Sequence, residues 1–254
     1  MYKVMVNHVR QILFFVLVFF AAWSSYSDSA IANATQDILR KADQSRGNLA
    51  GITWKVVLAN AETRTETMTF DVKARGYDIL TENLAPPRDR GNKVLMVNGN
   101  MWFHKPGLSK PVPISQRQRL MGNAAYGDIA ATNYAEDYEA TLLGEESVNG
   151  GVCYVFDLKA KDNRAAYDRI KYWISKERVV GVKAEYFTVS GKRFKSATME
   201  SANTVRIDGE VRPFISKITI YDELLSSNVT TLDLTRPTFR KLASYIFDVN
   251  LLVK

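Results

Sequence analysis

ISQRQRLMGNAAYGDIAATNYAEDY, which occupies residues 114–138, is the stretch of sequence that decides the predicted fold. Long regions of alternating apolar and polar residues lie on both sides of it, and such alternation is typical of strands. The stretch itself does not alternate. It is rich in Ala, Gly and Asn, and its large side chains are those of Leu120, Met121, Tyr126, Tyr134 and Tyr138. A sheet protein that interrupts itself in this way is expected to use the segment as a cover.

Helix-start signals recur within this segment. Ser115, followed three residues later by Gln118, fits a capping box and predicts a short helix that ends before Gly122. Asp128 and Thr132 are of the residue types that cap helix N-termini. We therefore predict short helices inserted between strands, placed to plug the open face of a curved sheet.

Strand signals fill most of the remaining chain. We predict about eleven strands, over residues 52–58, 68–74 with 77–80, 94–97, 101–104, 139–143, 152–160, 169–175, 179–189, 194–200, 214–222 and 229–234. Short turns such as Asn98-Gly99 and Asn149-Gly150 join them, which is typical of antiparallel hairpins. A helix is predicted over residues 33–48 and a turn of helix over residues 239–247. So many short-linked strands form one antiparallel sheet, which must curl.

The N-terminus has the layout of a secretory signal peptide. Lys3, His8 and Arg10 precede an apolar run over residues 12–22, and Ala30 and Ala32 form an A-x-A arrangement. The apolar run is shorter than the roughly 20 residues that a transmembrane helix needs. We predict a cleaved signal peptide over residues 1–32, a single domain over residues 33–254 and a location in the periplasm.

The net charge and the cysteine content indicate which binding partners and which covalent links to expect. The net charge is +7, but the basic residues are scattered rather than clustered, so nucleic acid is not an expected partner. The positive balance is compatible with transient contact to anionic membrane surfaces, but ordinary solubility is the simpler explanation for it. Cys153 is the only cysteine, so no intrachain disulfide exists, and its apolar surroundings favour a buried side chain.

Catalysis has little support in the sequence. After residues 1–32 the chain contains one histidine, His104, and no G-x-S-x-G elbow or phosphate-binding glycine loop. Clustered His and Cys ligands for zinc are absent as well. The acidic clusters at residues 136–139 and 145–146 are interpreted as loop charge. We predict a protein that is not an enzyme and that carries no metal or cofactor.

Large apolar and aromatic side chains are abundant on the predicted strands. The set comprises Trp54, Met96, Trp102, Phe103, Tyr154, Phe156, Tyr172, Trp173 and Ile174. Some of these side chains form the core of any sheet protein. However, the concave face of a curled sheet is filled by side chains, by covering helices or by a ligand. An apolar cavity without catalytic groups favours a hydrophobic guest such as an acyl chain.

A resemblance to a known family agrees with this interpretation. KVLMVNGNMWFHKPGLSKPVPISQRQRLMGNAAYGDIAATNYAEDYEATLLGEE, residues 93–146, resembles the bacterial outer membrane lipoprotein-sorting protein family, whose members are related to the LolA and LolB lipoprotein carriers. YVFDLKA at residues 154–160 and AEYFTVSGKRFK at residues 184–195 extend the match. It is most specific at Trp102, residues 119–122, Asp128 and Tyr138.

The resemblance implies an unclosed antiparallel β-barrel with short helices as a lid over an apolar cavity for acyl chains. The residues expected to contact lipid are Trp54, Met96, Trp102, Leu120, Met121, Tyr126, Tyr134, Tyr138 and Tyr172. The residues expected to control the lid are Asp128 and one or more of Arg90, Arg117 and Arg119. Met121→Asp or Trp102→Ala is expected to weaken lipid binding in a folded protein.

Two functions follow from the resemblance. The first is a periplasmic carrier that binds lipid or lipoprotein acyl chains and transfers them toward the outer membrane. The alternative is a periplasmic lipid or lipoprotein sensor, or an accessory subunit of an RND-type lipid exporter. An inner-membrane transporter of the RND or ABC type is the expected protein partner. The identity of the lipid and the direction of transfer are not encoded in any motif.

Overall fold

A computed structural model describes residues 33–61, 67–130, 133–225 and 227–253. The predicted signal peptide lies outside these residues. The chain divides into two compact units, residues 1–38 and residues 39–254, and the second unit contains every described strand. Residues 33–44 are helical. No helix in the described part of the chain is long and apolar enough to cross a membrane.

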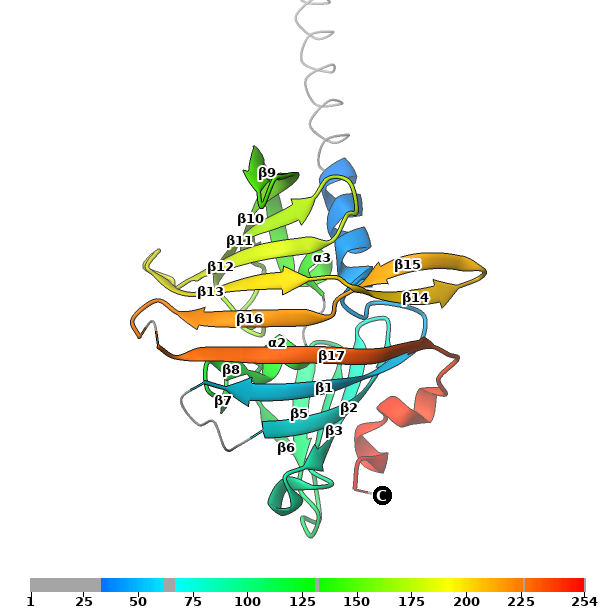
Figure 1. The fold of residues 1–254 in the computed structure, drawn as a ribbon. Coiled ribbons are helices and arrows are strands. Elements are labelled where there is room, and N and C mark those ends of the chain that lie inside the picture. Colours follow the sequence, from blue (N-terminus) through cyan, green and yellow to red (C-terminus); the bar gives the residue numbers. More distant parts are fainter. Residues whose placement is uncertain (1–32, 62–66, 131–132, 226, 254) are drawn as a thin grey trace, which may run out of the picture. The chain divides into compact units, whose positions relative to one another are not determined.

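One antiparallel sheet of thirteen strands dominates the second unit (Figure 1). Its order is β6-β5-β4-β3-β2-β1-β17-β16-β13-β12-β11-β10-β9. The bounds are β1 Ile52–Asn60, β2 Thr67–Arg75, β3 Asp78–Ala85, β4 Lys93–Val97, β5 Asn100–His104, β6 Val112–Ile114, β9 Tyr138–Val148, β10 Gly151–Ala160, β11 Arg169–Ser175, β12 Gly181–Phe187, β13 Arg193–Glu200, β16 Lys217–Asp222 and β17 Val229–Phe239. The end strands β6 and β9 do not pair with each other, so the barrel is unclosed, as predicted.

Two small hairpins accompany the main sheet. β14, Asn203–Ile207, pairs with β15, Glu210–Phe214, and β7, Arg119–Met121, pairs with β8, Ala124–Ala125. With them the described residues contain seventeen strands rather than about eleven. The strands without a counterpart in the prediction are β6, β7, β8 and β14 and most of β15; β6, β7 and β8 have only two or three residues, too few to show alternation.

The segment at residues 114–138, called the plug segment below, is only partly helical. α2, Tyr126–Ala130, and α3, Tyr134–Asp137, are short helices, as predicted, but Asp128 lies within α2 and is not its N-cap, and Asn133 is the N-cap of α3. The helix predicted from Ser115 is wrong. The Ser115 hydroxyl accepts a hydrogen bond from the Arg117 amide in a local turn, and the following residues pair as β7. Thr132 lies outside the described residues.

Two predictions for the C-terminal part also fail. Residues 239–247 are not one turn of helix, because β17 extends to Phe239 and only η2, Ser244–Phe247, is helical, in the 3-10 form. The predicted strand over residues 214–222 is two strands. The β14–β15 hairpin ends at Phe214, and β16 begins at Lys217 in the main sheet.

The C-terminal segment, which contains η2 and η3 (Val249–Leu251), covers one face of β3 and β4. Leu80 and Leu95 pack there with Leu242, Phe247 and Leu252. Neighbouring residues of a strand point to opposite faces. Met96 therefore faces the other side, the interior of the curved sheet, where it is fully buried.

A candidate ligand pocket at the mouth of the sheet

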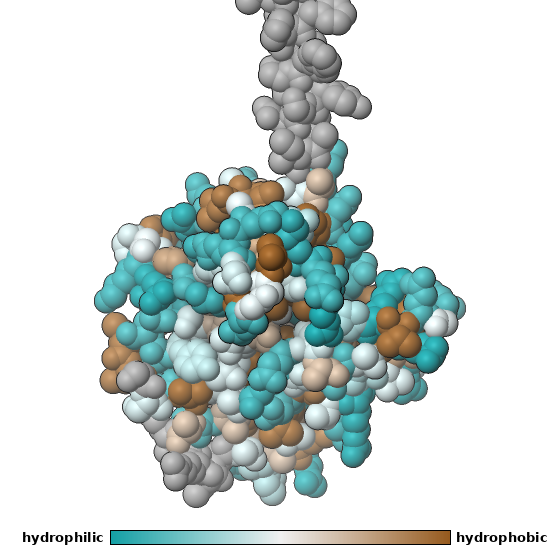
Figure 2. Space-filling model, turned by 45° about the horizontal axis from the view of Figure 1, so that its top comes forward, coloured by the Kyte–Doolittle hydropathy of each residue, from teal (hydrophilic) through white to brown (hydrophobic). Residues whose placement is uncertain are grey.

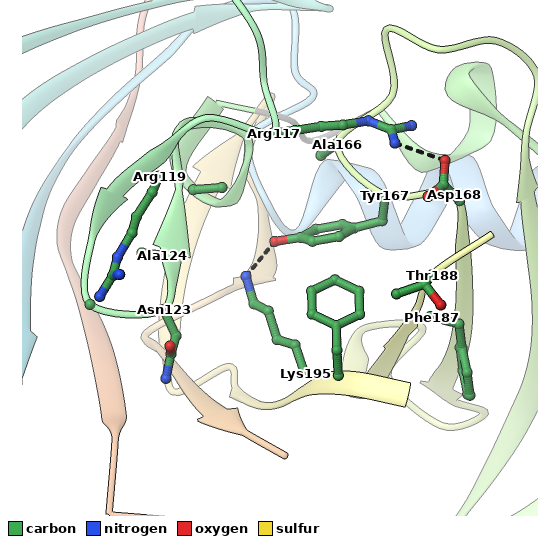
Figure 3. A pocket seen from close by; sticks show the side chains of 13 residues that line it. Arg117, Arg119, Asn123, Ala124, Ala166, Tyr167, Asp168, Phe187, Thr188 and Lys195 are labelled. Carbon is green, nitrogen blue, oxygen red and sulfur yellow. Dashed lines mark hydrogen bonds and ion pairs between the residues drawn. The ribbon is translucent and has the colours of Figure 1, made fainter. Parts of the chain in front are cut away.

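A pocket of about 320 Å³ lies between the plug segment and strands β12 and β13 (Figure 3). We call it the mouth pocket. Its apolar lining comes from alanines and phenylalanines, and its polar lining from three cations, one carboxylate, a tyrosine, a threonine and an asparagine. The lining residues are Arg117, Arg119, Gly122, Asn123, Ala124, Ala125, Ala166, Tyr167, Asp168, Phe187, Thr188, Phe194 and Lys195. Its volume is at the lower end of the range for small-molecule sites.

A buried ion pair ties the plug segment to the sheet beside this pocket. Lys195 Nζ on β13 lies 2.6 Å from Asp128 Oδ2 in α2, and both side chains are 6% exposed. The second Asp128 oxygen accepts a hydrogen bond from the Tyr167 hydroxyl at 2.7 Å, and Lys195 also contacts that hydroxyl. Figure 3 shows the Lys195 and Tyr167 side chains directed toward one another. We call Asp128, Tyr167 and Lys195 the latch.

Burial shapes the electrostatics of the latch. It lowers the pKa of Lys195, although the Asp128 carboxylate opposes the shift. Burial also raises the pKa of Tyr167 well above its ordinary value, so its hydroxyl remains a donor. Asp128 Oδ2 additionally accepts the Ala125 amide at 2.7 Å. Because removal of one partner of a buried pair costs about 3–5 kcal/mol, the latch holds α2 in place.

A second tie involves Arg117 at the start of the plug segment. Its Nε donates to the Ala165 carbonyl at 2.9 Å and its Nη1 lies 2.8 Å from Asp168 Oδ1. Both acceptors lie in the connection between β10 and β11. The carboxylate of Asp168 is about one-third exposed, so water screens this ion pair and its contribution is small.

The turn between β7 and β8 forms the third tie. The backbone amide of Asn123 donates to Thr230 Oγ1 at 2.9 Å, and its side-chain Nδ2 donates to the backbone carbonyl of Asn228 at 2.7 Å. Asn60 completes the network with bonds to Asn228 and Thr230. Gly122 has a φ of +55°, and a Cβ there would overlap Asn60 Nδ2 and Thr230 Oγ1. Only glycine fits this close approach.

Beneath α3 the interior is filled by aromatic rings and a second pair of charged residues. The Tyr134 ring packs edge-on against Tyr138 and Tyr172, with centroids 5.5 and 5.1 Å away, and lies 4.3 Å from the Arg46 guanidinium carbon. Asp43 Oδ2 accepts the Ala135 amide at 2.8 Å. Burial raises the pKa of Asp43 to about 7, against the opposing effects of this bond and of Arg46.

The predicted lipid-contacting residues fall into three groups. Trp54, Met96, Tyr134, Tyr138 and Tyr172 are buried in the interior. Leu120, Met121 and Tyr126 are partly buried on the plug segment. Trp102 stands apart, because it pairs with Leu95 and packs against the C-terminal segment on the other face of the sheet.

The residues predicted to control the lid lie at different places in the structure. Asp128 belongs to the latch, Arg117 to the second tie, and Arg119 lines the mouth pocket. Arg90 follows η1, Pro87–Asp89, and donates to the Leu84 carbonyl at 3.1 Å, outside the mouth pocket.

His104 Nε2 lies 3.0 Å from the Leu108 carbonyl, and Cys153 is buried. Among the residues that the structure describes, no group of three His, Cys, Asp or Glu side chains is placed to hold a metal ion.

Several residues of this site were not predicted, yet two carried a signal. Lys195 occupies an inward position of an alternating strand, next to Ala197 and Met199 on the same face. Asp43 follows Leu39 by one helical turn and therefore lies on the apolar face of its helix. A charge at such a position indicates a buried pair. Tyr167 and Asn123 lie in connections, where no period marks them.

The fold and the site together define an unclosed antiparallel barrel with its mouth covered by its own plug segment. The chain belongs to the LolA superfamily: it is 31% identical to a superfamily member from Nitrosomonas europaea, with 84% of this chain and 97% of that one covered at a TM-score of 0.74. A family model described as "Uncharacterized protein" matches residues 77–254. No curated protein matches the chain.

Two further solved structures share the fold at lower identity. A DUF1329 family protein from Desulfovibrio piger is 20% identical, with 87% of this chain and 98% of that chain covered and a TM-score of 0.70. A domain assigned as an outer membrane lipoprotein-sorting protein from Vibrio parahaemolyticus is also 20% identical, with 88% and 100% covered and a TM-score of 0.72. The predicted family and fold are therefore confirmed.

Proposed function

We propose that this protein is a periplasmic carrier that binds the acyl chain of a lipid or lipoprotein beneath its plug segment, without covalent chemistry. The observation that carries the proposal is the plug segment itself. In a member of the LolA superfamily, polar contacts hold it over an interior lined by aromatic side chains. An inner-membrane transporter and a cleaved signal peptide over residues 1–32 belong to the same proposal.

The structure corresponds to the closed state of such a carrier. The mouth pocket is too small for a long chain, and the interior is filled by buried side chains of the sheet together with Tyr134 and Tyr138 of the plug segment. Displacement of α3 would expose Tyr172, which Tyr134 now covers at a centroid distance of 5.1 Å. An acyl chain would take the place of these rings.

The energies are compatible with ligand-driven opening. Burial of a methylene contributes about 0.8 kcal/mol, so a sixteen-carbon chain contributes on the order of 10 kcal/mol before entropy costs. Rupture of the latch alone costs several kcal/mol. Opening and closing of the plug segment would then set the rate of transfer.

The chemistry of the mouth pocket supports a ligand with an anionic head. Arg119 lines it, and so do Arg117 and Lys195, which are engaged in ion pairs with Asp168 and Asp128. Cations favour phosphate or carboxylate groups, while the alanines and phenylalanines of the lining favour the start of an apolar chain.

The test is direct. Protein purified without detergent is extracted and analysed by lipid mass spectrometry, and the delipidated protein is titrated with a fluorescent fatty acid. We expect co-purified lipid and saturable probe binding. A protein that carries no lipid and does not bind the probe is not a carrier.

A further inference from the structure

Large apolar side chains are exposed on two neighbouring loops at one end of the sheet. Val189 is 87% exposed in the turn between β12 and β13. Leu224 and Leu225 are 67% and 57% exposed just after β16. We call residues 188–192 and 221–225 the mouth loops. Figure 1 shows both on the same side of the sheet, at the left of the view.

Backbone and ionic contacts hold the second mouth loop against the start of β13, directly after the first mouth loop. The amide of Glu223 donates to the carbonyl of Phe194 at 3.1 Å, and its carboxylate lies 2.9 Å from Arg193 Nη2. Asp222 lies opposite Lys195 in the ladder of β13 and β16. The second mouth loop is therefore attached to β13, the strand that follows the first mouth loop in the chain.

The leucines are presented by an ordered turn. Asp222 Oδ1 accepts the amide of Leu224 at 2.7 Å and that of Leu225 at 3.1 Å. This side-chain-to-backbone pattern stabilises a turn. The turn holds two adjacent leucines in solvent, where their side chains add no burial to the stability of the fold. Figure 2 shows that hydrophobic residues on the face in view form separate brown patches in a largely hydrophilic surface.

The mouth loops border the mouth pocket. Phe187 precedes the first loop, Thr188 is its first residue and Phe194 lies just beyond it, and all three line the pocket. The third tie lies at the same end of the sheet, because Asn123 is bonded to Asn228 at the start of β17. A ligand that leaves the pocket on this side meets the mouth loops first.

We propose that the mouth loops dock onto a lipid bilayer, with Val189, Leu224 and Leu225 inserted among the headgroups. The proposal rests on the proposed carrier function and names the surface through which the lipid would pass. Val189, Leu224 and Leu225 are each more than half exposed beside the pocket, and apolar side chains of this kind gain burial at the boundary between headgroups and acyl chains. The exposed Lys192 favours anionic headgroups, whereas Arg193 and Glu223 neutralise one another.

Vesicle flotation tests the proposal with the full-length mature protein. Vesicles contain phosphatidylethanolamine with phosphatidylglycerol, and binding is compared among wild type, Val189→Asp and Leu224→Asp/Leu225→Asp. Each variant places a charge at a position that would enter the membrane. We expect binding to fall at least about tenfold in the double variant, and less in Val189→Asp. Lys192→Glu should weaken binding to these vesicles more than to phosphatidylcholine vesicles.

Val211→Asp is the matched control, because Val211 is also 57% exposed but lies on the β14–β15 hairpin. It should float like wild type. Equal flotation of all variants, or no flotation of wild type, overturns the docking surface. Titration of the wild-type protein with the fluorescent fatty acid, without vesicles, separates the two proposals. Flotation without probe binding would contradict the carrier function. Probe binding without flotation would contradict only the docking surface.

Discussion

Lys195 of β13 and Asp128 of the plug segment form an ion pair at 2.6 Å, although 67 residues separate them in the chain. The pair is bonded to Tyr167 from a third part of the chain. Three segments therefore meet at one buried polar point, and the plug segment cannot leave the sheet without exposing it to solvent or leaving a buried charge unpaired.

The latch gives the first prediction. Lys195→Met leaves the Asp128 carboxylate buried without its cation, so we expect a loss of about 3–5 kcal/mol in the free energy of unfolding. Urea denaturation measures it. The double variant Lys195→Met/Asp128→Leu removes both charges and should recover much of the loss. If the double variant is no more stable than Lys195→Met, the two side chains are not coupled.

The second prediction concerns the turn of the plug segment. Gly122→Ala introduces a Cβ that overlaps Asn60 and Thr230, at a positive φ. We expect a loss of at least about 2 kcal/mol and faster hydrogen exchange in residues 118–130. Gly150→Ala is the control, because Gly150 also has a positive φ of 81° but nothing within 4 Å of its Cβ position. Equal effects of the two substitutions would show that the close approach is unimportant.

The third prediction is a dependence of stability on pH. Burial raises the pKa of Asp43 from 3.8 to about 7. Between these values the folded protein retains a proton that the unfolded chain releases, so stability falls as the pH rises through this window and levels off above it. Burial also raises the pKa of Asp137, to about 6, which adds a contribution of the same sign.

Asp43→Asn isolates the Asp43 contribution, because the amide oxygen can still accept the Ala135 amide. Its free energy of unfolding should decline less than that of wild type between about pH 5 and about pH 8. Asp71→Asn, a substitution at a partly exposed carboxylate paired with Lys73, is the control. An unchanged pH profile in Asp43→Asn would contradict the assignment.

The fourth prediction addresses the ligand. Thr188→Trp places a large ring at the wall of the mouth pocket, so it should reduce fatty-acid probe affinity several-fold while leaving the fold intact. Asn163→Trp places the same ring in a different pocket, one of about 480 Å³ beside Trp102 and Gln116. The affinity of this control variant for the fatty-acid probe should equal that of the wild type. The opposite order of effects would place the ligand in the second pocket.

The fifth prediction separates two residues that the sequence grouped together. Met121→Asp puts a charge on the plug segment and should weaken probe binding. Trp102→Ala removes a partly buried ring packed against the C-terminal segment, so it should lower the unfolding free energy, by less than the about 3–5 kcal/mol of a fully buried ring, with little effect on binding. Weaker binding in both variants, at unchanged stability, would place Trp102 at the ligand.

The sequence by itself determined the β-rich architecture, the antiparallel pairing through short turns and the interruption at residues 114–138. These features depend on local alternation and on turn residues such as Asn98 and Gly99, whose φ angles are 51° and 74°. Strands of two or three residues, such as β8, carry no such signal. They form only because a partner is supplied by the surrounding structure.

Tertiary structure alone decided which residues form the site. Lys195, Asp128 and Tyr167 are far apart in the chain, and no local pattern states that they meet. Tertiary structure also decided the place of Trp102. It is the neighbour of Met101 on β5 and therefore points to the opposite face of the sheet. Alternation shows that two neighbouring residues face opposite ways, but which face becomes the interior is set by the curvature of the whole sheet and by the segments that cover it.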